Sequence, residues 1–217
     1  MNKNTLLLVF LLLGIQHTFA QQEHRITTDE LLEWNFYGQG EMSQWGDQVI
    51  LKEADDTKGV MLISPEEYGE DVVMRYKVMA LTPATVLVSL LAMSDIESSD
   101  KLTMSEDYDG NMGLWINEKD NYFFAYKNAP HNATPFLRKY PNPGELISAK
   151  DNGMIAGVYY DVEVGKKGDL LWLSIDGEKI FETKDDSPLK GGHVAVRIRG
   201  VKGFNAGCII KDMTITE

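Results

Sequence analysis

The chain has 217 residues, of which 33 are acidic and 21 are basic, so its formal net charge is −12. This balance argues against a nucleic-acid partner, because binding nucleic acid requires basic patches that replace phosphate counterions. The length is compatible with one β-domain, whose core would be large enough to need no disulfide staples.

Residues 1–20 have the pattern of a secretory signal peptide. Lys3 precedes the apolar run Leu6–Leu13, and Ala20 supplies a small residue at the expected cleavage point. The run is short for a bilayer, so we expect no stable membrane insertion and a secreted or periplasmic protein. The alternative is an N-terminal membrane anchor that stays attached. Residues 21–217 are then expected to form a single domain.

The first half of the chain has the pattern of short strands separated by turns. We predict strands over Leu31–Gly40, Trp45–Lys52, Lys58–Ser64, Asp71–Leu81 and Thr85–Met93. The second and third of these are expected to form a hairpin across Ala54–Thr57. One short helical turn is predicted at Ser64–Gly69, and a polar surface loop at Ser94–Asp109.

The second half continues the same pattern. Predicted strands are Gly110–Ile116, Tyr122–Asn128, Ala156–Val164, Leu170–Ile175, Glu178–Glu182, His193–Arg199 and Gly207–Ile215. Asp176-Gly177 is the strongest hairpin signal. Pro130–Met154 has no regular pattern, and such long loops often bind ligands or act as lids. Many short strands with almost no helical period predict an all-β sandwich or barrel.

The segment Asn121–Pro141 combines aromatic rings, amides, a histidine and cations where a strand gives way to a loop. Ring faces stack on the C–H surfaces of sugars, while amides and guanidinium groups bind hydroxyls and carboxylates. We therefore expect a carbohydrate or polysaccharide ligand here. The alternative is an edge strand followed by a loop that aromatic side chains plug.

Alternation along His193–Arg199 separates an apolar side from a cationic one. Val194, Val196 and Ile198 share one side, whereas Arg197 and Arg199 share the other. If the polar sides of several strands fall on one concave sheet, they form a sugar-binding groove; otherwise they form an ordinary solvated face. The predicted ligand-binding residues are Trp115, Tyr122, Tyr126, Asn128, His131, Arg138, Trp172, Arg197 and Arg199, with Trp115 or Trp172 as the stacking platform.

The C-terminal third resembles a known superfamily. The residues that carry the resemblance are GVYYDVEVGKKGDLLWLSIDGEKIFE, then GGHVAVRIRG and CIIKDMTI. They are similar to the closing strands of the concanavalin A-like lectin/glucanase superfamily, and the last two runs resemble its YesU-like family of secreted proteins associated with polysaccharide use. The resemblance implies a jelly roll of two antiparallel sheets. Superfamily members include lectins, binding modules, hydrolases and lyases, so fold alone does not fix function.

The resemblance suggests two catalytic alternatives to simple binding. Laminarinase-type glycosidases carry three alternating acids on one strand, whereas this chain keeps only Asp161 and Glu163, with Tyr159 at the first position. Alginate-type lyases use a Gln/His pair, an arginine and a tyrosine; Tyr126, His131 and Arg138 would suit such a site, together with the two arginines of His193–Arg199, but no Gln-x-His element is present. A non-catalytic interaction domain is the third possibility.

Metal and thiol chemistry find little support in the sequence. The histidines lack the spacing of zinc ligands. No cofactor is expected, although the resemblance implies that a structural calcium ion could bind through Asp47 or Asp212. Cys208 is the only cysteine and lies in an apolar run, which predicts a buried strand position.

Overall fold

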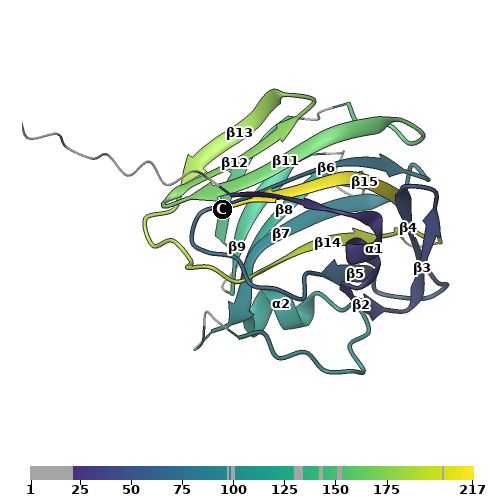
Figure 1. Ribbon diagram of the computed structural model, residues 1–217, viewed down its shortest axis with the longest axis horizontal. Helices are drawn as coiled ribbons and strands as arrows, with labels where there is room; N and C mark the ends of the chain where they lie inside the picture. The colour runs from purple at the N-terminus through teal and green to yellow at the C-terminus, as the bar shows by residue number, and fades with distance from the viewer. Residues whose placement is uncertain are drawn as a thin grey trace, which may run out of the picture.

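Two antiparallel sheets face each other in the computed structural model (Figure 1), which describes residues 22–96, 98, 101–129, 134–141, 144–150, 153–201 and 203–217. The predicted all-β sandwich is therefore confirmed. The predicted signal peptide, residues 1–20, lies outside the described residues.

The first sheet, sheet A, has β15 near its middle. Its order is β13 (Glu178–Lys184), β12 (Leu170–Ile175), β11 (Tyr159–Lys167), β6 (Val72–Ala80), β15 (Gly207–Thr216), β4 (Gln48–Glu53) and β3 (Gly40–Trp45). β1 (Glu23–Ile26) pairs with the second half of β15, and β4 pairs with the first half. An irregularity between Lys211 and Thr214 separates the two halves.

The second sheet, sheet B, has β7 at its centre. Its order is β10 (Gly144–Ser148), β9 (Phe136–Tyr140), β8 (Lys119–Lys127), β7 (Val86–Asp95), β14 (His193–Arg199), β5 (Val60–Ile63) and β2 (Asn35–Gly38). Two short helices accompany the strands in the described part of the chain, α1 (Thr28–Leu32) and α2 (Gly113–Asn117).

The main core lies between the sheets and follows strand alternation. On β14, Val194, Val196 and Ile198 point into it, as predicted. The core also holds buried hydroxyls: the Tyr76 hydroxyl is hydrogen-bonded to Ser89 Oγ at 2.8 Å and to the Tyr126 hydroxyl. Desolvation raises the pKa of both tyrosines, so they remain neutral hydrogen-bonding groups.

A second apolar layer covers the outer face of sheet B. Trp115 of α2 is fully buried against this face, where it joins side chains of the sheet such as Val88, Phe123 and Ala195. Figure 1 shows α2 and its flanking loop on the side of sheet B that faces away from sheet A. Much of sheet B is thus buried on both faces, which removes the polar-out alternation expected of a half-exposed sheet.

Four sequence predictions near the N-terminal half are wrong, among them the helical turn at Ser64–Gly69, where Tyr68 instead forms an isolated β-bridge with Gly192. Trp45–Lys52 and Lys58–Ser64 do not form a hairpin, because β4 belongs to sheet A and β5 to sheet B. Leu31–Gly40 is not one strand: α1 occupies its start, since Thr27 and Glu30 form a capping box in which each side chain accepts a backbone N–H of the other. Gly110–Ile116 is not a strand either, because Trp115 packs from a helix.

Other predictions are confirmed or refined. Pro130–Met154 contains β9 and β10 rather than being wholly irregular. Asp176 and Gly177 both have positive φ, as a two-residue hairpin between β12 and β13 requires. Cys208 is buried on β15, and desolvation raises the pKa of its thiol to about 12. None of the helices in the described residues is long and apolar enough to cross a membrane.

A buried polar cluster ties β8 to the connection between β13 and β14. The Tyr122 hydroxyl donates to Asp185 Oδ2 at 2.6 Å and accepts from the Leu189 N–H at 2.9 Å. Lys139 Nζ lies 2.9 Å from the same carboxylate oxygen. Burial raises the pKa of Asp185, but the hydrogen bonds from Lys139 and Tyr122 outweigh it and leave the pKa below its ordinary value.

This cluster predicts a pH-dependent stability term. Because the folded-state pKa of Asp185 is lowered, its stabilisation is present above the ordinary carboxyl pKa and is lost as pH falls through the folded-state value. Asp185→Asn should therefore lower the free energy of unfolding by about 1–3 kcal/mol at pH 7, and by less at pH 3, which lies below the ordinary carboxyl pKa. Urea unfolding at both pH values measures this. The exposed neighbour Asp186 gives the matched control Asp186→Asn, and an equal loss at both pH values would contradict the prediction.

Candidate functional site

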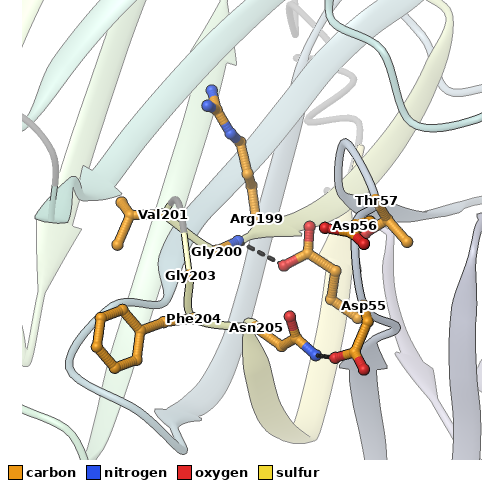
Figure 2. A pocket seen from close by; sticks show the side chains of 10 residues that line it. Asp55, Asp56, Thr57, Arg199, Gly200, Val201, Gly203, Phe204 and Asn205 are labelled. Atoms are coloured by element: carbon orange, nitrogen blue, oxygen red, sulfur yellow. Dashed lines mark hydrogen bonds between the residues drawn. The ribbon is translucent and has the colours of Figure 1, made fainter.

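Two connections between the sheets meet at one edge of the sandwich and enclose a cleft. The first joins β4 to β5 (54–59), and the second joins β14 to β15 (200–206). They line an open cavity of about 500 Å³ whose walls include Glu53, Asp55, Asp56, Phe204 and Asn205. Figure 2 shows Val201 and Phe204 on one side and Asp55, Asp56 and Thr57 on the other, with Arg199 between them. We call this space the acidic cavity.

Glu53 holds the two connections together. Its Oε2 accepts the Gly200 N–H at 2.6 Å and the Ala206 N–H at 2.9 Å, and its own N–H donates to the Ala206 carbonyl at 3.0 Å. The side chain is buried at the end of β4. The backbone of the second connection comes so close to Gly200 that only glycine fits there, since a Cβ would lie 2.0 Å from the Phe204 carbonyl oxygen.

The acidic cavity combines a ring with hydrogen-bonding groups. Phe204 is 68% exposed, although it follows a turn closed by its N–H donating to the Val201 carbonyl at 2.8 Å. The next residue, Asn205, donates from Nδ2 to Asp55 Oδ1 at 2.6 Å, which fixes this carboxylate across the two connections. An exposed large ring on a constrained turn is a surface that can stack against a ligand.

A smaller cavity of about 210 Å³ adjoins the first, and Thr57 and Arg199 line both. Its other walls are Lys58, Asn111, Met112 and Arg197. We call it the cationic cavity, and the two cavities together the Arg199 cleft. Arg199 is exposed and makes no hydrogen bond or ion pair with any described residue, and its charge disfavours that of the neighbouring Arg197.

Arg197 is the best-anchored member of the cationic cavity. Its side chain is only 2% exposed, and its Nη2 donates to the carbonyls of Lys58 at 2.7 Å and Gly110 at 3.1 Å. Desolvation lowers the pKa of its guanidinium to about 10, so it remains charged at neutral pH. Both Arg197 Nε and Thr57 Oγ1 are buried without a hydrogen-bond partner among the described residues.

The predicted groove does not form, because its members lie on opposite faces of sheet B. Arg197 and Arg199 lie in the cleft, on the outer side. Tyr122 and Tyr126 are fully buried in the core between the sheets, where their hydroxyls bond to protein groups. Strand alternation places Tyr122 and Tyr126 on the same side of β8 as the apolar Phe124, and this side faces the core.

The remaining predicted residues are also dispersed. Asn128 is buried and donates to the Thr134 carbonyl at 3.3 Å. Arg138 lies on β9, over the Phe136 ring at 4.7 Å and 3.6 Å from Glu145. His131 lies outside the described residues. Trp115 is no stacking platform, since it is fully buried and its Nε1 donates to the Tyr108 hydroxyl at 2.8 Å.

Trp172 and the two acids of β11 lie together on the outer face of sheet A. Trp172 lies against Gly165, and its Nε1 donates to Glu163 Oε1 at 2.6 Å. Arg75 pairs with Glu163 and lies 3.9 Å from Asp161. The acids line a separate open cavity of about 520 Å³. Both oxygens of Glu163 accept from donors, one from Trp172 Nε1 and the other from Arg75.

No group of three histidine, cysteine or acidic side chains in the described residues could hold a metal ion. Asp212, one of the two residues considered for calcium, lies near Lys77 at 3.5 Å and Arg25 at 3.9 Å. These cations already balance its charge.

Sequence reasoning missed the acidic half of the cleft. Asp55 and Asp56 lie where the sequence predicts a hairpin turn, and Phe204 and Asn205 lie in the link between the last two predicted strands, to which the sequence pattern assigns no role. A signal was present, because a phenylalanine beside glycine in a polar link has no strand face to bury it. Only the pairing of β4 and β5 with different sheets brings the two connections together.

Comparisons with known proteins address the fold. No family model matches the chain, and no curated protein matches it in sequence. A protein of unknown function with a galectin-like fold from Bacillus subtilis superposes with a TM-score of 0.76 at 16% identity, covering 90% of this chain and 97% of the other. The chain has a concanavalin A-like jelly-roll fold.

Two further structures share this jelly roll. A β-1,3-1,4-glucanase (lichenase) derived from a mouse hindgut metagenome has a TM-score of 0.58 at 12% identity, covering 92% of this chain and 99% of its own. The carbohydrate-binding module CBM66 from Bacillus subtilis has a TM-score of 0.55 at 11% identity, with 84% and 95% covered. At such identities the likeness shows the fold alone, and membership of the YesU-like family stays a prediction.

The Glu53 contacts predict a specific loss of stability. Glu53→Ala would leave the buried N–H groups of Gly200 and Ala206 without their acceptor, which costs about 1–3 kcal/mol for each unpaired group. Urea unfolding followed by tryptophan fluorescence should show a lower free energy of unfolding. Glu53→Gln keeps one acceptor oxygen and should lose less. The exposed Glu41 on β3 provides the control, Glu41→Ala, which should stay within about 0.5 kcal/mol of the parent. Equal stability of Glu53→Ala and Glu41→Ala would contradict the clamp.

Proposed function

We propose that this protein binds carbohydrate in the Arg199 cleft. The observation that carries the proposal is that an exposed ring, Phe204, lines the same open cavity as Asp55, Asp56 and Arg199. Sugars present apolar C–H faces and a rim of hydroxyls, so an aromatic ring and carboxylate or amide groups are complementary to them. In this arrangement Phe204 stacks on the sugar ring, Asp55 and Asp56 accept hydrogen bonds from sugar hydroxyls, and Arg199 donates hydrogen bonds to sugar oxygens.

Preorganisation supports this role. Glu53 fixes both connections from inside, and Asn205 holds Asp55, so the polar groups need little reordering when a ligand binds. Rigid sites lose less conformational entropy on binding, which favours affinity. The names of the structural neighbours agree with a carbohydrate ligand: they include a carbohydrate-binding module, a lichenase and a carrageenase solved with an oligosaccharide.

The site favours binding over bond cleavage. Glu53 is occupied by two backbone N–H groups, and Asp55 by Asn205, so two of the three carboxylates that line the acidic cavity already serve structural hydrogen bonds. Acid–base chemistry requires carboxyls free to exchange protons with the substrate. We propose that the protein acts outside the cytoplasm, in keeping with the signal-like pattern of residues 1–20.

Loss of the Phe204 ring tests the binding proposal. Phe204→Ala should weaken retardation in affinity gels of the polysaccharide that the parent binds, by roughly tenfold in affinity or more, which corresponds to about 1.4 kcal/mol. Its stability should change little, because the ring is exposed.

Trp45 offers a matched control for this experiment. It is 66% exposed on β3, away from the cleft, so Trp45→Ala removes an exposed ring without touching the proposed site. An equal loss of binding in both variants, or no binding of any polysaccharide in a broad panel, would overturn the proposal. Release of reducing ends, or of products absorbing as unsaturated uronates, would favour the enzymatic alternative.

A further inference from the structure

Arg197 is a buried cation that forms no ion pair, although Tyr108 and the more distant Glu53 favour its charged form. Within the described residues, no carboxylate lies within 4.0 Å of its guanidinium; its hydrogen bonds go to two backbone carbonyls, those of Lys58 and Gly110. A buried charge is costly unless it is paired and fully hydrogen-bonded. The two carbonyls satisfy Nη2, whereas Nε remains unpartnered. A purely structural role in holding the loops explains the hydrogen bonds of Nη2 to the two carbonyls. It does not explain why Nε is buried without a partner.

The surroundings of Arg197 add further donors. Arg199, Lys58 and Asn111 line the same cavity, and the buried Thr57 hydroxyl lacks a partner. Lys58 is paired with Asp109 at 2.7 Å, which lowers the pKa of that carboxyl, whereas Arg199 is unpaired among the described residues. A cavity of about 210 Å³ bounded by two guanidinium groups is large enough for a single charged substituent.

We propose that the cationic cavity binds an anionic substituent, a carboxylate or a sulfate ester, of the saccharide held in the acidic cavity. This inference rests on the proposed function. Thr57 and Arg199 line both cavities, so one ligand can place its ring beside Phe204 and its anion beside Arg197. The carboxylates of the acidic cavity then accept hydrogen bonds from the sugar hydroxyls. Because one cavity is acidic and the other cationic, the charges of the cleft fix the orientation of the sugar. An acidic glycan is thus the preferred ligand class, in spite of the net charge of −12.

Paired ligands that differ only in charge test this inference. Titration calorimetry would compare oligogalacturonate with its methyl ester, and carrageenan oligosaccharides with their desulfated forms. At least one anionic form should bind tenfold or more tightly than its neutral counterpart. The member of the pair that shows the preference identifies the substituent as carboxylate or sulfate.

Variants then locate the preference. Arg199→Gln should reduce the anionic-to-neutral ratio at least fivefold without loss of stability, because the side chain is exposed. Arg197→Lys keeps the charge but removes the forked donor and should also lower the ratio; its folding is checked by circular dichroism. Arg25→Gln changes the net charge equally on β1 of sheet A, and should leave the ratio unchanged.

The outcomes separate the two proposals. Equal binding of charged and neutral forms, with the Phe204 dependence intact, would overturn the anionic inference and leave carbohydrate binding standing. A preference that survives Arg199→Gln and Arg197→Lys would overturn it as well, since the anion would then bind elsewhere. If none of the charged or neutral saccharides binds, both the carbohydrate-binding proposal and the anionic inference are overturned.

Discussion

Burial of the outer face of sheet B is the constraint on which the site depends. In an open jelly roll this face would be available to a ligand, but here α2 and its flanking loop fill it with apolar side chains. Trp115 can be buried there because its indole N–H reaches the Tyr108 hydroxyl, which in turn donates to the Asn111 carbonyl. With the face dry, the exposed polar groups collect at its margin, where α2's preceding loop, the β4–β5 connection and the end of β14 meet.

The crossing between sheets determines how that margin is built. β4 and β5 are adjacent in sequence but lie in different sheets, so their connection must bridge the edge of the sandwich and cannot rely on a strand partner. Backbone groups in such a segment need other partners when they are buried. Glu53 supplies them for the neighbouring β14–β15 connection, and Arg197 Nη2 binds the Lys58 and Gly110 carbonyls. The same contacts that satisfy the backbone therefore also fix the walls of the cleft.

Strands with strong alternation of apolar and polar residues were predicted correctly from the sequence. The orientation of side chains was not predictable where both faces of a strand are buried. His193–Arg199 has a clear apolar and cationic side, and its strand and the orientation of its side chains are as predicted. On β8 both sides are buried, so parity could not show which of them faces the other sheet, and the tyrosine hydroxyls looked available for a ligand. Pairing between distant strands is invisible to local pattern, which is why the Asp55 and Phe204 segments were not brought together.

Arg197 combines structural hydrogen bonds with a position at the Arg199 cleft. Alternation places Ala195 and Arg197 on the same side of β14, yet Ala195 lies in the dry layer under α2 while Arg197 lies two residues farther, at the cleft. Its register neighbours on the adjacent strands, Met61 and Val88, are apolar, whereas its Nη2 supplies the hydrogen bonds of the Lys58 and Gly110 carbonyls. Replacing buried charge with well-packed apolar groups is often neutral or stabilising. An apolar residue here would leave the two carbonyls unpaired, so they account for Nη2 but not for the unpartnered Nε; on our proposal, a ligand that brings negative charge to the cleft accounts for the rest.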